Sequence, residues 1–446
     1  MIQIIFLIAF VLRLFFMSSW LEDWDSVQFA LALDDFSLVK HQPHPPGYPL
    51  YILLGRIINS YFQNPTLSLT FLSATLGALS VIPFYLLTKK LFDKKTAVLT
   101  SLVFISLPVH FVLSEIAISN MPGLFFLSVS ALAIYSQLPL AGLTSGLLLG
   151  VRPTDLPIIA GLITYLFFKR KRFLYRLSLI LGFLAGVSLW LIPLIYLTGL
   201  NEFKLINSET SKYFIWHDML FGKQFTFWTY INDRVTNLIK LFNIGYTPGF
   251  FAISTIAAFF EARKKPFLLV YLLSYTIPLL FIYNLELTQY TLPLSIVFSI
   301  FAVVFLKNLL PKKLFIPLYI VLVIFLFKTS FDTVKYQASA TPPTIEPVFY
   351  VKSNFKNQDT LLITTYTFRQ FQYYAPEYKN FYGKGNAPKN IDSKYVVVDY
   401  EGLAREIPSL SHYKVVAEKH FGPSKNKFVR LPETTLIVLR YTTPKN

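Results

Sequence analysis

Residues 173–198 read FLYRLSLILGFLAGVSLWLIPLIYLT, and this stretch decides the class of the protein. It exceeds the roughly 20 apolar residues that an α-helix needs to cross a bilayer, and its one charge, Arg176, stands near its start. The residues before it, Lys169-Arg170-Lys171-Arg172, are all basic. Because basic residues beside a span collect on the cytoplasmic side, the stretch predicts a transmembrane helix that begins inside the cell.

The composition of the whole chain agrees with a membrane protein. Of 446 residues, 54% are hydrophobic and 15% are charged, whereas about 25% are charged in soluble domains. With 44 Phe and 27 Tyr, the chain cannot hide its apolar surface in soluble cores, which excludes a soluble enzyme, a disordered scaffold and a fibrous protein. The net charge of +17 does not indicate nucleic-acid binding, because the charges stand mostly in short runs between apolar stretches. Cysteine is absent, which excludes disulfides, thiolate nucleophiles and Cys-based metal sites.

Apolar stretches recur along the chain and predict about eleven transmembrane helices. They lie near residues 1–18, 66–88, 95–112, 121–137, 139–151, 156–168, 173–198, 236–260, 266–285, 289–306 and 313–329. The stretches 139–151 and 156–168 are short, and broken segments of this kind often line a cleft rather than face lipid.

The Lys and Arg residues between the stretches predict the orientation, since cytoplasmic loops carry an excess of both. The richer set of loops contains Lys89, Lys90, Lys94, Lys95, Lys169, Arg170, Lys171, Arg172, Arg176, Arg263, Lys264, Lys265, Lys307, Lys312 and Lys313. The opposite set contains Lys40, Arg56, Arg152, Lys204, Lys212, Lys223 and Arg234. We therefore expect a multi-pass protein of the plasma membrane, with the N-terminus in the cytoplasm and the C-terminus outside.

The chain divides into two predicted domains. Residues 1–329 form a transmembrane domain with outer loops at 19–65 and 199–235. Residues 330–446 form a small extracytoplasmic α/β domain, and its first part includes a Pro- and Thr-rich linker at 338–347. Strands are expected at Thr360–Thr365, Lys394–Asp399, Tyr413–Glu418 and Thr434–Tyr441. The predicted fold class is thus an α-helical polytopic membrane protein with a C-terminal α/β domain.

Three carboxylates follow the first span directly: Glu22, Asp23 and Asp25. A carboxylate near the membrane surface is costly to desolvate and so tends to have a purpose, such as a general base that takes a proton from an attacking hydroxyl. Asp25 has a second interpretation, because it could cap a helix over Ser26–Leu33. Residue chemistry alone favours the capping role.

The same loop continues with His41-Gln42-Pro43-His44-Pro45-Pro46-Gly47-Tyr48-Pro49-Leu50-Tyr51, whose prolines fix an unusual backbone path. His41 and His44 with nearby acids could hold a metal, but no third ligand stands at helical spacing, so a rigid loop facing a substrate is favoured. An aromatic, amphipathic helix over Tyr48–Tyr61 is expected at the membrane interface.

An Asp-Ser pair after the first span, a short helix and then His-Pro-Pro-Gly-Tyr-Pro-Leu-Tyr together resemble the GT-C superfamily of polyprenyl-phosphate-sugar glycosyltransferases, in its protein O-mannosyltransferase-like branch. The resemblance covers roughly residues 1–310. It implies that Asp25 is the catalytic base, with Asp23 or Glu22 as a supporting acid because Ser26 and Gln28 replace the usual ones. His44 and Tyr48 would contact the substrate.

Three further positions resemble this superfamily less closely. Glu115 and Asn120 stand where the family has a second acidic patch, although Asn120 replaces an acid there. Arg152 lies in a Gly-Val-Arg-Pro break between two short spans, where its planar fork could hold a phosphate; its other interpretation is snorkelling to the interface. Gln289 and Tyr290 match an Arg-Tyr-x-x-Pro motif, with Gln in place of the phosphate-binding Arg.

The resemblance implies an inverting transfer of a sugar, such as mannose, from a polyprenyl-phosphate donor to a protein, lipid or glycan hydroxyl on the outer face. It names no certain cofactor and leaves a divalent cation requirement open. The other expected partners are membrane lipids. A different class of function, a lipid-linked sugar flippase or exporter, would place its site near the bilayer midplane, often between inverted repeats, and the sequence contains no such repeat. A plain membrane anchor would not need so many spans.

Overall fold

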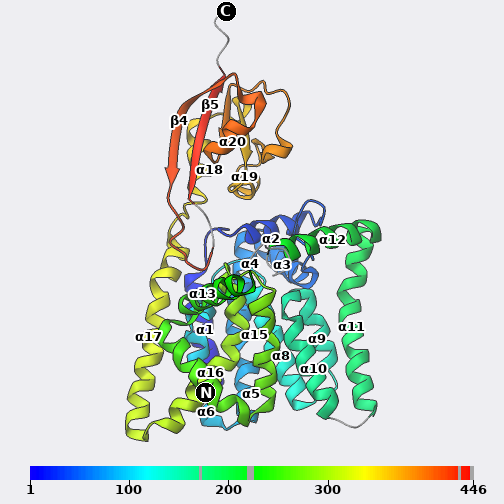
Figure 1. The fold of residues 1–446 in the computed structure, drawn as a ribbon, viewed down its shortest axis with the longest axis vertical. Coiled ribbons are helices and arrows are strands. Elements are labelled where there is room, and N and C mark those ends of the chain that lie inside the picture. Colours follow the sequence, from blue (N-terminus) through cyan, green and yellow to red (C-terminus); the bar gives the residue numbers. More distant parts are fainter. Residues whose placement is uncertain (170–172, 218–225, 430–432, 442–446) are drawn as a thin grey trace, which may run out of the picture.

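The computed structural model of this protein describes residues 1–169, 173–217, 226–429 and 433–441. Its helices form a bundle, and a separate C-terminal domain stands above one end of it (Figure 1). The short helices of the first loop lie at this same end, which we call the domain-bearing end. The sequence predicted that the first loop and the C-terminal domain share one side of the membrane, and they share one end of the bundle.

The bundle is built from helices of very different length. The first part contains α1 (Ile2–Phe16), α2 (Trp24–Asp34), α3 (Pro49–Phe62), α4 (Pro65–Leu79), α5 (Val81–Leu91), α6 (Lys94–Ser106), α7 (Pro108–Ser114), α8 (Asn120–Ser136), α9 (Ala141–Val151), η1 (Pro153–Asp155), α10 (Leu156–Lys169) and α11 (Phe173–Thr198). The second part contains α12 (Leu200–His217), α13 (Phe227–Tyr246), α14 (Pro248–Glu261), η3 (Ala262–Lys264), α15 (Pro266–Phe281), η4 (Thr288–Leu294), α16 (Ser295–Leu309) and α17 (Lys312–Ser339).

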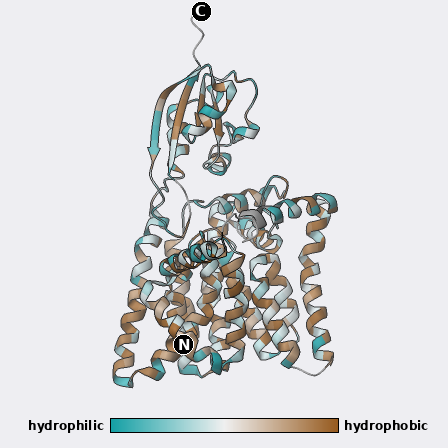
Figure 2. Ribbon diagram, viewed as in Figure 1, coloured by the Kyte–Doolittle hydropathy of each residue, from teal (hydrophilic) through white to brown (hydrophobic). Residues whose placement is uncertain are grey.

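Within the described residues, four helices are long and apolar enough to cross a membrane, or up to six if each of two bent pairs counts as one span. The four are Pro65–Leu91, Phe173–Thr198, Thr288–Leu309 and Lys312–Ser339. Shorter apolar helices, among them α1, α8, α9 and α15, complete the bundle. The protein is therefore a multi-pass membrane protein, while the expected number of about eleven spans stays a prediction. Hydrophobic residues dominate the bundle, whereas the C-terminal domain mixes both kinds (Figure 2).

Prolines set the two bends, because a proline lacks the N–H that would continue the preceding helix. Pro108 starts α7 at 59° to α6, and Pro248 starts α14 at 110° to α13. The prediction of one continuous span over 236–260 is therefore wrong: α13 lies across the bundle near the domain-bearing end (Figure 1), and α14 follows at the 110° bend. The apolar run in the sequence hides this bend, since both arms are hydrophobic.

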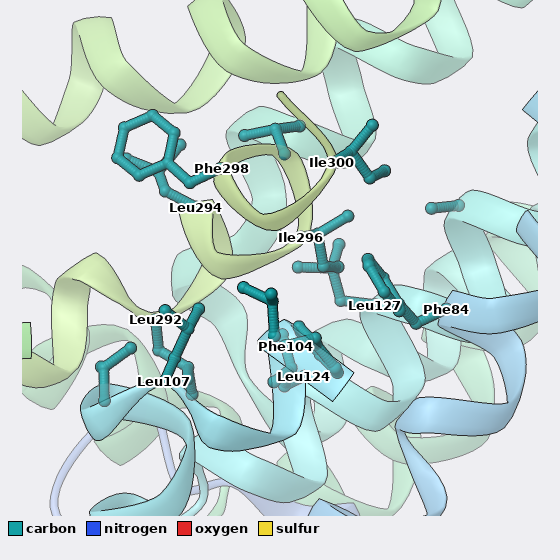
Figure 3. Packing of buried hydrophobic residues seen from close by; sticks show 14 of the residues in the cluster. Phe84, Phe104, Leu107, Leu124, Leu127, Leu292, Leu294, Ile296, Phe298 and Ile300 are labelled. Atoms are coloured by element: carbon teal, nitrogen blue, oxygen red, sulfur yellow. The ribbon is translucent and has the colours of Figure 1, made fainter. Parts of the chain in front are cut away.

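The core of the bundle is a continuous cluster of buried aromatic and aliphatic side chains from helices far apart in the sequence. Phe84 of α5 and Phe104 of α6 stack at 4.2 Å between ring centroids, and Leu124 and Ile296 lie nearby (Figure 3). Stacked aromatic pairs add roughly 1 kcal/mol to the energy of their burial. This packing holds α4–α8 and α16 together.

Small residues let α9 and α11 approach closely. A Cβ on Gly142 would meet the Leu179 carbonyl oxygen at 2.1 Å, and one on Gly146 would meet the Phe183 carbonyl oxygen at 2.4 Å. Within a membrane, where lipid is as apolar as leucine, such close backbone packing is a main source of helix association. This contact anchors α11 to α9.

The C-terminal domain contains a five-stranded mixed sheet in the order β2-β1-β3-β5-β4. Its elements are α18 (Glu346–Asn354), η5 (Asn357–Asp359), β1 (Thr360–Thr364), α19 (Phe368–Tyr374), β2 (Lys379–Tyr382), η6 (Lys384–Asn386), β3 (Tyr395–Val398), α20 (Glu401–Glu406), η7 (Pro408–Leu410), β4 (Tyr413–Phe421) and β5 (Thr434–Tyr441). β2, β1 and β3 are parallel, and β5 and β4 continue the sheet antiparallel. The four predicted strands are confirmed and β2 was missed, because its sequence KNFY does not alternate cleanly.

The C-terminal domain also reaches back to the bundle. The segment between β4 and β5 places Phe428 and Val429 in the core cluster of the bundle, and Ser424 Oγ donates a hydrogen bond to Glu22. From α19, Tyr374 Oη accepts from the Leu21 N–H at 2.8 Å. Residues separated by almost the whole chain therefore hold the first loop in place.

Candidate active site

The site begins at α2, where the two acids of the first turn have different tasks. Asp23 precedes the helix, and its Oδ1 accepts a hydrogen bond from the Asp25 N–H at 2.8 Å. Asp23 is therefore the N-cap, and the alternative that Asp25 caps a helix from Ser26 is wrong, since the helix starts at Trp24, two residues earlier than that alternative required. The Asp25 carboxylate is left facing the loop, with 37% of its side chain exposed.

The loop that follows α2 brings His44 next to Asp25. His44 Nδ1 lies 3.5 Å from Asp25 Oδ1 and 2.8 Å from Gln28 Oε1, while its Nε2 lies 3.1 Å from Tyr48 Oη. A neutral imidazole with its proton on Nδ1 satisfies these partners: it donates to Gln28 and accepts from the Tyr48 hydroxyl. Asp25, Gln28, His44 and Tyr48 thus form one network, which we call the Asp25 cluster.

An unusual backbone presents His44 and Tyr48. Gly47 has φ +104° and Tyr48 has φ +46°, and Pro49 then occupies the first turn of α3. Positive φ is common for glycine and rare for tyrosine. Phe29 packs edge-on against Tyr48 at 5.1 Å between ring centroids and holds this conformation. The HPPGYPLY segment thus places both side chains of the cluster, while its rigidity stays a prediction.

Burial controls the ionisation of the cluster. Desolvation raises the pKa of Asp25 to about 6. For Asp23, desolvation and the neighbouring Asp25 charge raise the pKa to about 7. Desolvation and the positive Arg369 lower the pKa of His44 to about 4. At neutral pH the network consequently contains an ionised Asp25 beside a neutral imidazole.

Glu22 does not join this cluster. Its side chain is 4% exposed and faces the segment between β4 and β5, where Ser424 donates a hydrogen bond to it. Desolvation raises the pKa of Glu22 to about 7, and hydrogen bonds from Ser424 and Asn426 oppose the rise. Glu22 therefore lies at the contact between the first loop and the C-terminal domain.

Arg152 lies in the break between α9 and η1, buried at 3% exposure beneath the Asp25 cluster. Its Nε donates to Thr154 Oγ1 at 3.0 Å and lies 3.6 Å from Asp155 Oδ1, and its Nη2 donates to the Gln289 carbonyl at 3.3 Å. The Asn120 amide faces the same guanidinium, and its oxygen accepts from Nη1 and Nη2 in the orientation that satisfies both groups. Snorkelling to the interface does not describe a side chain enclosed in this way.

The η4 segment supplies the other predicted donor-binding residues. Gln289 contacts Arg152 through its backbone carbonyl. The expected binding of the donor phosphate by its side chain therefore stays a prediction. The Tyr290 ring stacks on Tyr283 at 5.3 Å. Tyr48 lies close enough to Tyr290, Asp25 and Arg152 for all three to act on its hydroxyl electrostatically. Tyr48 is thus the link between the Asp25 cluster and the arginine below it.

Glu115 lies in a different cluster inside the bundle. It is fully buried, and its nearest cationic group is Arg13 of α1, whose guanidinium donates to Ser114 Oγ at 3.1 Å and contacts His110 Nδ1 at 2.8 Å. Asn120 contacts Arg152, but Glu115 belongs with Arg13. The resemblance grouped these two residues because they are close in sequence, and the turn between α7 and α8 separates them.

Two charged residues of the candidate site were not predicted from the sequence. Asp155 follows Arg152 by three residues, and its buried carboxylate makes the ion pair described above, which the spacing Arg-x-x-Asp could have suggested. Arg369 comes from α19 of the C-terminal domain, where its Nη2 donates to the Lys40 carbonyl at 3.2 Å. No signal in the sequence connects a residue of the last domain to the first loop.

Next to His44, a cavity of about 620 Å³ opens between the first loop and α12. Leu38, Val39 and Pro45 on one side and Leu205 and Ile206 on the other make its walls mainly apolar, with Glu202, Glu209 and Thr210 at its rim. Nowhere in the described ranges do three His, Cys, Asp or Glu side chains group as metal ligands would. His41 and His44 both line the cavity, so the Asp25 cluster meets it through His44.

Comparisons with known proteins converge on one fold. Residues 37–119 match the protein O-mannosyl-transferase TMEM260 N-terminal domain. The structure is similar to ArnT from Cupriavidus metallidurans bound to undecaprenyl phosphate, at 11% identity and a TM-score of 0.61 over 98% of this chain and 97% of that one. It is also similar to the Archaeoglobus fulgidus oligosaccharyltransferase in its apo form, at 13% identity and a TM-score of 0.54 over 98% and 76%. The chain thus shares the fold of these two proteins, and the family model matches one part of it.

A further similar structure, the archaeal oligosaccharyltransferase AglB from Archaeoglobus fulgidus in complex with an inhibitory peptide and a dolichol-phosphate, matches at 12% identity and a TM-score of 0.53, over 89% of this chain and 69% of that one. No curated protein sequence matches the chain. The family match includes His44, Tyr48 and Glu115, and leaves Asp25 and Arg152 outside it.

Proposed function

We propose that this protein transfers a sugar from a polyprenyl-phosphate-linked donor to an acceptor hydroxyl, with Asp25 as general base. The observation that carries the proposal is the Asp25 carboxylate, which is held beside a neutral His44 at the edge of a cavity and is not used as a helix cap. Similarity to a protein O-mannosyl-transferase domain supports mannose as the sugar and a protein as the acceptor.

The pKa values favour Asp25 over His44 as the general base. A carboxylate with a pKa of about 6 is mostly ionised at neutral pH yet still basic enough to accept a proton in the transition state. His44, with a pKa of about 4, is a weaker base by about a factor of 100, and its two nitrogens are already occupied by Gln28 and Tyr48. We therefore assign His44 the role of fixing the position of Asp25 and Tyr48.

The proposed reaction is one displacement. The acceptor oxygen forms a bond to the anomeric carbon while the bond from that carbon to the phosphate oxygen breaks, and the acceptor proton passes to Asp25. The lipid phosphate leaves with the electron pair, and attack from the opposite face inverts the anomeric centre. Since Asp25 acts on the acceptor rather than on the sugar, no covalent enzyme intermediate is expected.

Charge on the leaving phosphate needs a positive counterpart. We propose Arg152 for this role, with Tyr290 and the Gln289 side chain as further donors of hydrogen bonds. Arg152 is favoured by its place below Tyr48 and by the planar fork of its guanidinium, which suits phosphate oxygens. Because Asp155 lies 3.6 Å from Arg152 and offsets part of its charge, the arginine needs to turn toward the donor when the donor binds.

The proposal places the reaction on the outer face of the plasma membrane, with the domain-bearing end outside and the N-terminus in the cytoplasm. The asymmetry of Lys and Arg between the two sets of loops supports this orientation. In this orientation the donor's lipid chain lies in the outer leaflet, and the cavity beside His44 is open to acceptors outside the cell.

The test uses the purified full chain in lipid nanodiscs with a short-chain isoprenyl-phosphate mannose and a Ser/Thr-containing peptide. We expect mannosylated peptide and isoprenyl phosphate in equal amounts, measured by mass spectrometry. The same assay with isoprenyl-phosphate glucose and isoprenyl-phosphate aminoarabinose determines the sugar, and EDTA followed by Mg²⁺ or Mn²⁺ determines whether a divalent cation is needed. Movement of intact donor across the bilayer without any transfer would contradict the proposal and favour a flippase.

A further inference from the structure

A second cavity, of about 920 Å³, lies at the domain-bearing end, on the side of the bundle formed by α13 and α17. The start of α14 and the segment between β4 and β5 close it. It shares no lining residue with the Asp25 cluster or with the cavity beside His44. The proposed sugar transfer does not use it.

Three lysines from two parts of the chain converge on this cavity: Lys240 from α13, and Lys425 and Lys427 from the segment between β4 and β5. No carboxylate lines it, and none of the three lysines has an ion-pair partner among the residues that the structure describes. Like charges gathered within about 10 Å repel one another unless an anion lies between them. Three lysines and no carboxylate on the wall of one cavity therefore favour an anion as its ligand.

A buried hydroxyl supplies a second and independent indication. Thr247, between α13 and α14, is 6% exposed, and its Oγ1 has no hydrogen-bond partner although it lines the cavity. Its φ of +65° is rare for a β-branched residue and is disfavoured by sterics. An unpartnered buried hydroxyl is costly unless a ligand completes it. The same residue precedes the first turn of α14, where helix N–H groups favour an anion.

The position of the cavity along α17 indicates what carries the anion. At 1.5 Å per residue, Phe325 lies about 20 Å and Thr333 about 32 Å from the start of α17 at Lys312. The hydrocarbon layer is about 30 Å thick, so the cavity runs from the hydrocarbon of one leaflet to its headgroups. Phe325 is 50% exposed and offers an apolar surface at the deeper end.

We propose that this cavity binds a lipid phosphate: the phosphate lies between Lys240, Lys425, Lys427 and the Thr247 hydroxyl, and the chain runs along α17 past Phe325. The ligand is a lipid of the leaflet at the domain-bearing end, either an anionic phospholipid or a polyprenyl phosphate. The binding of such a lipid beside the segment between β4 and β5 would attach the C-terminal domain to the membrane.

The test compares lipid retention by the full chain, purified in neutral detergent and measured by native mass spectrometry. The probes are phosphatidylglycerol, undecaprenyl phosphate and, as a neutral reference, phosphatidylcholine. The variant Lys240→Gln/Lys425→Gln/Lys427→Gln should bind both phosphate lipids about 100-fold more weakly, because each lysine near a lipid phosphate contributes about a factor of five. The control Lys328→Gln/Lys335→Gln/Lys419→Gln removes the same charge outside the cavity and should keep most of the binding.

Each outcome decides the proposal. Equal losses of lipid binding in the two triple variants would show that binding depends on general charge attraction, and this would overturn the proposed site. Displacement of the lipids by millimolar inorganic phosphate would also overturn it, because the site would then recognise a free anion. Retention of undecaprenyl phosphate alone would support the proposal and assign the site to the carrier; equal retention of phosphatidylglycerol would support it and assign a general anionic lipid.

A second variant keeps the test independent of folding. Thr247→Val retains the β-branched shape at φ +65° and removes only the hydroxyl. We expect an unchanged melting temperature and several-fold weaker lipid retention. Wild-type retention by this variant would remove Thr247 and the start of α14 from the site.

Discussion

Replacing Asp25 by Asn separates catalysis from structure at the candidate active site. The α2 helix keeps its cap, because Asp23 accepts the N-terminal hydrogen bond. The Asp25 side chain approaches His44 Nδ1 at 3.5 Å, which is too long for a strong hydrogen bond. An amide of the same size should thus change the free energy of unfolding by only about 0.5 kcal/mol.

Turnover should change far more. General-base catalysis typically contributes 10²- to 10⁴-fold, so Asp25→Asn should lower kcat by about this factor, or about 3–5 kcal/mol in the activation barrier, with donor binding largely retained. The pH profile offers a second readout. With a pKa of about 6, Asp25 is protonated below that pH, and kcat/KM of the wild type should fall about tenfold per pH unit below 6. The Asn variant should lose this acidic limb.

The assay is single-turnover release of isoprenyl phosphate in nanodiscs between pH 4.5 and 8, with donor affinity measured separately. Asp23→Asn is the matched control, since Asn caps a helix as well as Asp does. We expect near wild-type turnover from it. An Asp25→Asn protein that is folded, binds donor and turns over like the wild type would refute the assignment, and loss only in Asp23→Asn would transfer the role to Asp23.

Four further predictions follow from other contacts. Arg152→Ala should raise the donor KM at least tenfold. Arg152→Lys should recover only part of this loss, because lysine keeps the charge but lacks the bidentate fork. Unchanged kinetics in the Ala variant would leave Arg152 with a structural role. Burial raises the pKa of Glu22 from 4.5 to about 7, so the folded state binds this proton more tightly, and the contribution of Glu22 to stability should be largest below pH 4.5 and fall by up to about 3 kcal/mol as pH rises through 7. Glu22→Gln should remove this share of the pH dependence in thermal unfolding and leave the share of Asp23 and Asp25. Gly146→Ala should lower stability by about 1–3 kcal/mol, while Gly385→Ala, which has open space around it, should not. Reporter fusions after Lys90 should report the cytoplasm and fusions at the last residue the exterior, and a cytoplasmic C-terminus would place every proposed site on the wrong side.

Several features of the fold were predictable because they depend on local chemistry. The apolar length of Phe173–Thr198 and the alternating or β-rich runs of β1, β3, β4 and β5 each carry their own signal, and both were predicted correctly. The bend at Pro248 was not predicted, because a proline in an apolar run is compatible with a kinked span as well as with a turn of 110°. The hydrophobicity of a segment indicates its affinity for lipid but not the direction in which its helix runs.

The candidate site was predicted in part for a similar reason. His44, Tyr48 and Asp25 lie in one loop, and a short chain segment limits how far apart they can be. Which acid caps the helix depends on a shift of two residues in the helix start, and here Asp23 rather than Asp25 is the cap. The separation of Glu115 from Asn120, the burial of Glu22 under Ser424 and the approach of Arg369 depend on packing between distant segments, for which a single sequence gives no measure.

The hydrogen bond between Ser424 and Glu22 joins residues 402 positions apart, so the ribosome makes its two partners at very different times. A membrane protein is inserted from its N-terminus as it is synthesised, at about 5–20 residues per second. The first loop is thus made roughly half a minute before the segment that fastens it exists. Until the C-terminal domain has been made and has folded, Asp25 and His44 lie in a loop without its final support. With Asp25 as the proposed general base, the nascent chain should be inactive until its last domain docks.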